Sequence, residues 1–236
     1  MCRNWQIYTF DVLSSTNDKI KEYCAQKGQF VVVQAKTQTA GRGRQGRSWQ
    51  SLNGNLFFSV ALEFDMQFLG VLVFMSALSV LQTIKLFSQK AAVQLKWPND
   101  VLLNNKKVSG ILLEKGQGLY MIIGIGVNIE KSPDDTQVLY PTTSLREAQI
   151  NTSADAFLQN YLRCFSRNMD LYTQNGAEAI YREWMQYAKG IGQKILVQQN
   201  KETKEGIFKG IDANGFLMLQ NKCKTEKIAF GDVFYI

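Results

Sequence analysis

The chain contains no histidine, only three prolines and only four cysteines among its 236 residues. The absence of histidine excludes a Ser-His-Asp triad, a Cys-His pair and every histidine-ligated metal site. Cys2, Cys24, Cys164 and Cys223 form no C-x-x-C pair. The N-terminus also lacks a basic segment followed by an apolar run, so we expect free thiols and a cytoplasmic location.

Long apolar runs are also scarce. The run from Phe68 to Leu81 is shorter than the roughly 20 residues that a membrane-spanning helix needs. Its apolar spacing continues to Phe87 and predicts a core helix, so we expect no membrane partner. The net charge of +7 favours anionic partners, but it does not choose among nucleotides, nucleic acids and acidic protein surfaces.

Residues 1–188 and 189–236 carry different patterns and predict two domains. In the first, helices are expected over 14–28, 68–87, 153–176 and 177–188, and strands over 6–12, 30–33, 55–63, 93–95, 101–103, 108–113 and 119–129. Strands mixed with segregated helices predict an α+β fold with a mixed sheet flanked by helices. In the second, short strands are expected over 194–198, 205–211, 216–219 and 227–230, and they predict a small β-barrel.

The segment from Gly41 to Trp49 threads three arginines through three glycines and ends on an indole. Guanidinium groups and glycine backbone suit a loop around a phosphorylated, ring-bearing ligand. The alternative is a solvated loop. The glycine spacing also matches a dinucleotide-binding fingerprint, with Glu63 at a suitable distance. That motif must open a helix, however, and the turn at Asn53-Gly54 follows too soon, so we reject the dinucleotide hypothesis.

Two further segments carry polar chemistry inside apolar sequence. Pro98 interrupts a strand pattern, and Asn99 and Asp100 after it are candidate oxygen ligands for Mg²⁺, partners of a nucleotide, or parts of a plain turn. Trp97 is expected in the core. Glycines at 124 and 126 within an apolar strand predict either a bulge or the close approach of a ligand to the backbone.

Five motifs in chain order closely resemble those of biotin protein ligases: Ser15-Thr16-Asn17, Gln38 to Arg47, Leu95 to Asp100, Lys107 to Gly110, and Gly124 to Asn128. Thr143-Ser144-Leu145 fits the same pattern. The resemblance covers most of residues 7–145 and implies a class II synthetase-like catalytic domain with an SH3-like C-terminal barrel. It implies the monofunctional form, because the chain begins close to the first expected strand and leaves no room for a DNA-binding domain.

The resemblance also assigns roles to individual residues. Lys107 and Arg44 are the implied catalytic residues, and Asp100 is the implied metal ligand. The implied biotin-binding residues are Ser15, Thr16, Asn17, Gln38, Gly41, Arg42, Gly43, Arg44, Lys107, Gly110 and Gly124. The implied ATP-binding residues are Arg47, Trp49, Lys96, Asn99, Asp100 and Asn128.

The reaction that the resemblance implies joins biotin to ATP, with Mg²⁺, to give biotinyl-5'-AMP and pyrophosphate. Biotin then passes to one lysine of a biotin carboxyl carrier domain, with no DNA partner; a homodimer is compatible with this scheme. Preorganised cations suit the reaction because it brings two anions together. The acceptor lysine must lose a proton before its amine can attack. Either Asp100 accepts this proton, or the amine loses it to solvent in its own acid–base equilibrium.

Two rival functions use the same sequence features. A lipoate or octanoate transferase would also transfer its acyl group to an acceptor lysine, but it would need a longer apolar pocket. The loop from Gly41 to Trp49 favours biotin over these ligands. A non-catalytic nucleic-acid-binding module would extend its basic residues along the chain. Here the dense basic cluster is local, which favours the ligase.

Overall fold

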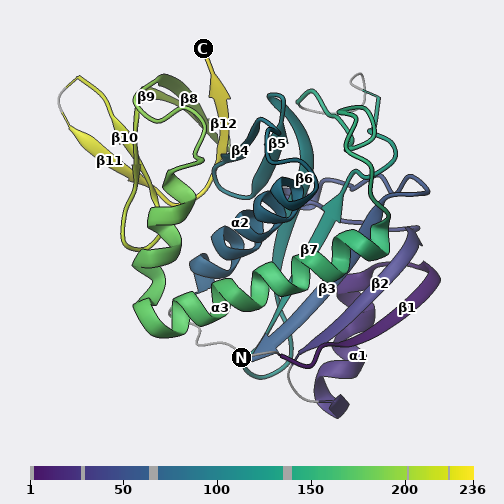
Figure 1. Cartoon of the computed structure of the whole chain (residues 1–236). Coiled ribbons are helices and arrows are strands. Elements are labelled where there is room, and N and C mark those ends of the chain that lie inside the picture. Colours follow the sequence, from purple (N-terminus) through teal and green to yellow (C-terminus); the bar gives the residue numbers. More distant parts are fainter. Residues whose placement is uncertain (1–2, 28–29, 64–68, 135–139, 201, 223) are drawn as a thin grey trace.

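A seven-stranded mixed sheet forms the larger part of the computed structural model, which describes residues 3–27, 30–63, 69–134, 140–200, 202–222 and 224–236. In spatial order the strands are β1 (Gln6–Leu13), β2 (Val31–Gln38), β3 (Leu56–Glu63), β7 (Tyr120–Val127), β6 (Lys106–Lys115), β5 (Asp100–Leu103) and β4 (Val93–Lys96). Strands β1 and β2 are parallel and the other neighbours are antiparallel. The expected α+β fold with a mixed sheet is confirmed (Figure 1).

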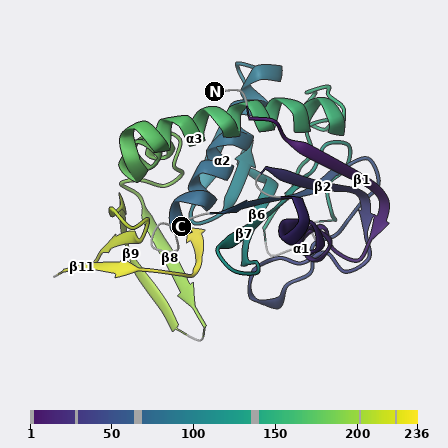
Figure 2. The same cartoon turned by 90° about the horizontal axis from the view of Figure 1, so that it is seen from below.

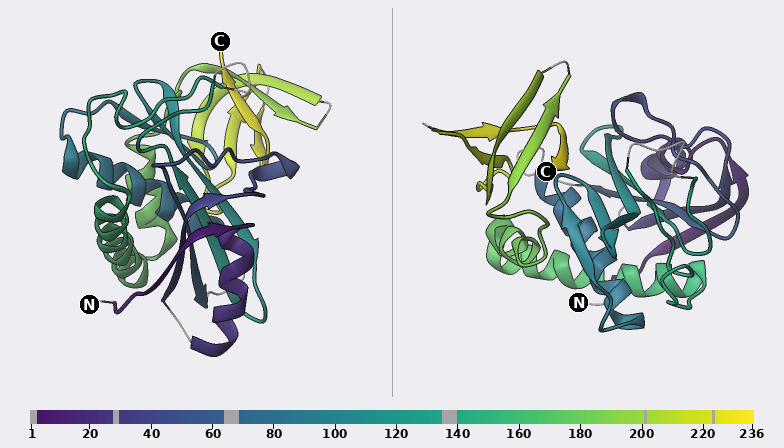
Figure 3. Two further views of the ribbon diagram at one scale, coloured as in Figure 1. Left: turned by 90° about the vertical axis from the view of Figure 1, so that its right-hand side faces the viewer. Right: turned by 90° about the horizontal axis from the view of Figure 1, so that it is seen from above.

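Helices cover both faces of this sheet. Figures 2 and 3 show α1 (Thr16–Lys27) on one face, and α2 (Leu69–Phe87) with α3 (Ala154–Met185) on the other. Successive side chains of each strand point to opposite faces of the sheet. Val31 and Val33 therefore pack in the cluster with α1, whereas Val32 packs in the main core with α2 and α3. The apolar segment expected to be a core helix is α2, and its expected first residue, Phe68, lies outside the described residues.

Helix α3 begins and bends where the sequence predicts. The Ser153 side chain accepts a hydrogen bond of 3.1 Å from the backbone N–H of Ala156 and so caps the helix. Gly176 interrupts the helical backbone with φ 74° and ψ −176°. The two helices expected on either side of Gly176 therefore form one element with a kink.

The turns between strands also follow the sequence. Asn104 and Asn105 have φ values of 51° and 65° and close the β5–β6 hairpin, as asparagine allows. Pro98 lies in the turn between the edge strand β4 and β5, as its missing N–H requires. Trp97 is 2% exposed and belongs to the core, which confirms that prediction.

The C-terminal residues form a five-stranded antiparallel sheet of the expected SH3-like kind, in the order β11 (Thr225–Ile228), β10 (Leu217–Gln220), β9 (Glu202–Ile211), β8 (Lys194–Gln199) and β12 (Asp232–Tyr235). The strand expected over 227–230 is wrong in its bounds, and β12 was not predicted. Gly231-Asp232 has the composition of a turn, yet Val233 is buried and pairs with Val197 of β8. Burial of this valine outweighs the local turn preference.

The Trp97 indole links the sheet to this barrel, because its Nε1 donates a hydrogen bond of 3.0 Å to the carbonyl of Gly215. The apolar core continues across the same junction, because Phe208 of β9 belongs to one buried cluster with residues of α2 and α3. Trp184 of α3 is 1% exposed and meets Phe74 of α2 edge to face, with ring centroids 5.0 Å apart. The barrel is thus packed against the helical layer and held close to the end of β4.

We predict that Trp184→Ala lowers the free energy of unfolding by about 3 to 5 kcal/mol, because it removes a fully buried indole and leaves a cavity beside Phe74. Chemical denaturation of the whole chain measures this loss. Glu178→Ala is the control, since it breaks only an exposed i,i+4 contact with Arg182. An equal loss in both variants would contradict the structure.

Candidate active site

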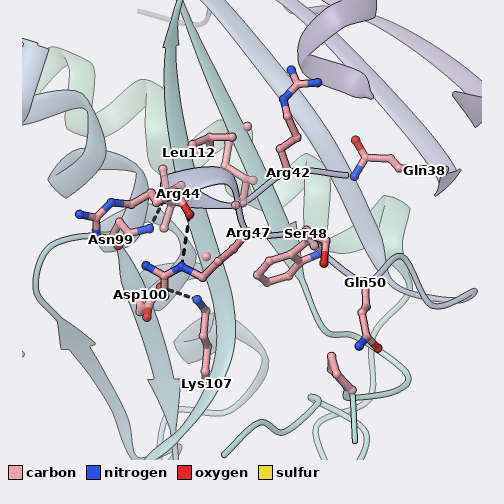
Figure 4. Close-up of a pocket in the computed structure, with 18 of the residues that line it drawn as sticks. Gln38, Arg42, Arg44, Arg47, Ser48, Gln50, Asn99, Asp100, Lys107 and Leu112 are labelled. Carbon is pink, nitrogen blue, oxygen red and sulfur yellow. Dashed lines mark hydrogen bonds and ion pairs between the residues drawn. The ribbon is translucent and has the colours of Figure 1, made fainter. Parts of the chain in front are cut away.

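A cavity of about 390 Å³ opens beside the loop from Gly41 to Trp49. Its walls come from the start of α1, the end of β2, strands β5 to β7, the residues Pro133, Tyr140 and Thr142, and the barrel. Figure 4 shows part of this lining. The predicted site residues that line it are Ser15, Thr16, Asn17, Gln38, Arg42, Gly43, Arg44, Arg47, Trp49, Asn99, Asp100, Lys107, Gly110, Gly124 and Asn128.

The arginine-rich loop folds back on itself as a narrow hairpin. The Gly43 N–H donates to the Arg47 carbonyl at 2.6 Å, and the Trp49 N–H donates to the Gly41 carbonyl at 2.9 Å. Gly46 has φ +73°, and a Cβ on Gly41 would lie 2.8 Å from the Trp49 carbonyl oxygen. These two positions need glycine. Gly43 has φ −107°, so this backbone conformation does not require glycine there.

Two of the loop arginines bind oxygen atoms at the cavity. Arg44 donates to Asn99 Oδ1 at 2.9 Å, and burial lowers the pKa of its guanidinium. Arg47 forms an ion pair of 2.9 Å with Asp232 of β12. The barrel therefore contributes a carboxylate to the cavity and holds one end of the loop.

Arg42 is placed differently. Its guanidinium lies 2.7 Å from Asp18 of α1 and 3.3 Å from Glu114 of β6, and in Figure 4 it points away from Lys107. The Arg42 guanidinium, through its hydrogen bonds, lowers the pKa of Asp18 to about 2. Arg42 thus ties the loop to the rim of the cavity, while its predicted contact with a substrate carboxylate stays a prediction.

The floor of the cavity is made of glycines on two neighbouring strands. Gly110 of β6 pairs with Gly126 of β7, and added Cβ atoms would lie 2.9 Å and 2.4 Å from the Trp49 ring. No side chain other than hydrogen fits beneath this indole. The strand β7 keeps a regular register with both neighbours, so the alternative of a bulge is wrong. The close approach of a ligand to these glycines stays a prediction.

Lys107 and Asp100 form an ion pair on facing strands. The Lys107 ammonium lies 2.7 Å from Asp100 Oδ1, and its side chain is 22% exposed (Figure 4). It also lies 5.5 Å from the centre of the Trp49 ring. Although Lys107 follows a hairpin turn, it is not an exposed rim residue, because the bulged β5–β6 register places it beside Asp100.

The other end of the cavity is neutral and polar. Gln38 Oε1 accepts a hydrogen bond of 2.8 Å from the Thr16 backbone N–H at the start of α1. Asn17 is 3% exposed, and its Nδ2 has no hydrogen-bond partner among the described residues. A Cβ on Gly124 would lie 2.4 Å from Asn17 Oδ1. Gly124 therefore makes room for this amide, which leaves donor hydrogens for a ligand.

Gly41 and Lys96 are predicted site residues that the structure does not place in the cavity lining. Gly41 lies behind the lining, against Trp49 and Gln38. Lys96 is 5% exposed, and its ammonium lies 3.0 Å from the centre of the Tyr140 ring. Desolvation lowers the pKa of Lys96 to about 7. A tyrosine ring thus lies over this ammonium, and the ATP-binding role of Lys96 stays a prediction.

Several lining residues were not assigned from the sequence: Ser48, Gln50, Ile111, Leu112, Ile125, Gly126, Pro133, Tyr140, Thr142 and Asp232. Strand alternation could have found Gly126, since it lies two residues from Gly124 and shares its face. Asp232 carries no such signal, because only the folded barrel brings it to Arg47.

Comparison with known proteins gives two family matches along the chain. Residues 9–128 match the biotin/lipoate A/B protein ligase family, and residues 190–235 match the biotin protein ligase C-terminal domain. The chain is 36% identical to the bifunctional ligase/repressor BirA of Bacillus subtilis, covering 94% of this chain and 72% of that protein. It is 34% identical to the biotin–[acetyl-CoA-carboxylase] ligase of Paracoccus denitrificans, covering 86% and 89%.

A solved structure agrees with these matches. The biotin protein ligase from Aquifex aeolicus, in complex with biotin and ATP, superposes with a TM-score of 0.86 at 25% identity and covers 97% of each chain. The similarity includes both the mixed sheet and the barrel.

We predict that Lys96→Met flattens the pH dependence of stability. The Lys96 pKa is about 7 in the fold against 10.5 for an ordinary lysine, so the unfolded chain binds more protons between these values. The parent's free energy of unfolding should therefore rise relative to that of the variant from pH 7 to pH 10. Denaturation across this range measures the difference. With the exposed Lys90→Met as control, parallel curves for parent and Lys96→Met would contradict the burial of this amine.

Proposed function

Because the chain belongs to the biotin/lipoate A/B protein ligase family and is a biotin ligase, we propose that it makes biotinyl-5'-AMP with release of pyrophosphate. It then transfers the biotin to a lysine of a biotin carboxyl carrier domain. The single observation that carries this proposal is the division of one cavity into a neutral donor end and a cationic end. The two ends suit the two parts of biotin, its ring and its carboxylate.

The neutral end is suited to the ring. Biotin's ureido group offers one carbonyl oxygen and two N–H groups, and the cavity offers the amides of Asn17 and Gln38 beside Ser15 and Thr16. A buried amide donor without a partner favours a ligand that brings an acceptor. A dithiolane ring has no comparable acceptor, so this end supports biotin over lipoate.

The cationic end is suited to the chemistry. A carboxylate must approach the α-phosphate of ATP although both are anions, and pyrophosphate carries charge away as it leaves. Lys107 and Arg44 are held by Asp100 and Asn99, so they meet this charge without large rearrangement. Fixed cations of this kind stabilise the transition state more than mobile ones do. Trp49, on its glycine floor, lies between the two ends and offers a face to adenine.

In the transfer step the acceptor lysine's amine attacks the carbonyl carbon of the mixed anhydride. The bond from that carbon to the phosphate oxygen breaks, and AMP leaves as an anion, which Arg44 and Lys107 are placed to stabilise. The proton that the attacking amine loses as the amide forms passes to Asp100 or to solvent. The name of the Paracoccus relative, an acetyl-CoA-carboxylase ligase, supports a carboxylase carrier as the acceptor. The net charge of +7 favours an acidic acceptor surface.

A Mg²⁺ ion fits the oxygen atoms at the cationic end. Asn128 is 1% exposed and its Oδ1 has no hydrogen-bond partner among the described residues, while Asp100 supplies a carboxylate nearby in the lining. Mg²⁺ is commonly bound by one or two protein oxygens together with substrate phosphates. When bound, the ion would neutralise charge on the phosphates of ATP.

The direct test mixes the protein with Mg·ATP and either biotin or lipoate, and follows pyrophosphate release. We expect release with biotin and little with lipoate, because only biotin brings an acceptor to the Asn17 amide. Adding a biotin carboxyl carrier domain should then give one biotinylated lysine per domain, which mass spectrometry detects. Release with lipoate but not with biotin would reject the proposal.

Lys107→Ala should lower the rate of biotin-dependent pyrophosphate release by about 10²- to 10³-fold, which is typical for loss of one electrostatic contact to a transition state. Lys106→Ala, at the exposed neighbouring position, is the matched control and should keep the parent rate. Because Lys107→Ala also leaves the buried Asp100 unpaired, thermal melting should show some loss of stability. An unchanged rate in folded Lys107→Ala would remove Lys107 from the mechanism.

A further inference from the structure

Ser59 is a fully buried polar residue behind the neutral end of the cavity. It lies on β3, is 0% exposed and does not line the cavity. Its hydroxyl lies 2.5 Å from Asn17 Oδ1 and 2.7 Å from Thr16 Oγ1. It belongs to none of the five motifs, so neither the sequence nor the family match assigns it a role.

The contact with Ser59 decides which side of the Asn17 amide faces the ligand. The Ser59 hydroxyl has a single proton, and in this arrangement it is donated to Asn17 Oδ1, so the 2.7 Å contact between the two hydroxyls takes its proton from Thr16. The Asn17 amide nitrogen is then the group left without a partner among the described residues. Gly124 lies so close to Asn17 that any side chain there would collide with the amide. The amide is therefore fixed by a hydrogen bond on one side and enclosed by backbone on the other.

Without the hydroxyl, the two orientations of an asparagine amide differ little in shape. A rotation of 180° about its last bond exchanges oxygen and nitrogen, and only hydrogen bonds tell them apart. In Ser59→Ala the amide can present its oxygen or its nitrogen to the cavity. The site would then lose much of its ability to select an acceptor on the ligand.

We propose that Ser59 is a positioning residue that selects the ligand ring through Asn17. It holds the Asn17 N–H groups toward the cavity and so favours a ring with a carbonyl oxygen, such as a cyclic urea. It disfavours an otherwise similar ring that presents donors at that position. This inference rests on the proposed function, since it concerns the ring-binding end of the same cavity.

The test compares biotin with 2-iminobiotin, in which an imino group replaces the ureido oxygen. This group is protonated at neutral pH and donates hydrogen bonds. Isothermal titration of the full chain gives the dissociation constant of each ligand, and their ratio is the preference. Because unfolded protein binds neither ligand, the ratio does not depend on the folded fraction.

Ser59→Ala should raise the KM for biotin about tenfold and leave the KM for ATP within about twofold, because one buried hydrogen bond at the ring end is lost. Its preference for biotin over 2-iminobiotin should fall by a similar factor. Ser59→Thr keeps a hydroxyl and should keep the preference. Ser76→Ala is the matched control, since Ser76 is equally buried but bonds the Leu72 carbonyl within α2.

A second variant tests the orientation of the amide without touching Ser59. Asn17→Asp presents only acceptors, so it should bind 2-iminobiotin more tightly than biotin. Parent-like preference in both Ser59→Ala and Asn17→Asp would overturn the inference while leaving biotin ligation intact. Failure of the parent to bind biotin would instead reject the proposed function.

Discussion

Each of three cations in one cavity is held by an oxygen atom of the protein itself. Lys107 meets Asp100, Arg44 meets Asn99, and Arg47 meets Asp232. Without these contacts, like charges on a glycine-rich loop would spread into solvent, where they are screened and reoriented by water. With them, the cations are fixed where two anionic groups must meet. A chain without histidine can thus join a carboxylate to a phosphate by means of positive charges held in fixed positions.

The same contacts connect parts of the chain that are far apart in sequence. Arg47 belongs to the loop and Asp232 to the last strand of the barrel, yet they form one ion pair. The Trp97 indole, beside Asn99 in sequence, donates to the barrel at Gly215. The barrel therefore supports both the loop and the turn that present the cationic groups, and it contributes to the cavity as well as packing beside it.

Local signals in the sequence predicted much of the fold, and most of the site residues that the family resemblance implied line one cavity. The start of α3 after Ser153 and the break in its helical backbone at Gly176 depend on short-range chemistry, so they lie where the sequence predicts the ends of helices. The glycines at 124 and 126 indicated either a bulge or the close approach of a ligand to the backbone. Their partners, Trp49 and Asn17, could not be identified without the fold.

Contacts between distant segments account for what could not be predicted. The strand β12 contradicts its local turn composition because Val233 is buried. Lys96 lies in a motif of the site, but Tyr140 from a different segment covers its ammonium. Ser59 belongs to none of the motifs, and its proposed positioning role depends on the packing of α1 against β3. In each case contacts between distant segments determine where the residue lies, and such contacts produce no periodic pattern in the sequence.

The most direct test of the central claim is a crystal structure of the chain with biotin and a non-hydrolysable ATP analogue. The account predicts that Lys107 Nζ and the Arg44 guanidinium lie within hydrogen-bonding distance, about 3 Å, of the biotin carboxylate or the α-phosphate. It also predicts that the Arg47–Asp232 ion pair still joins the loop to the barrel. Phosphates bound elsewhere, with both cations turned to solvent, would contradict it.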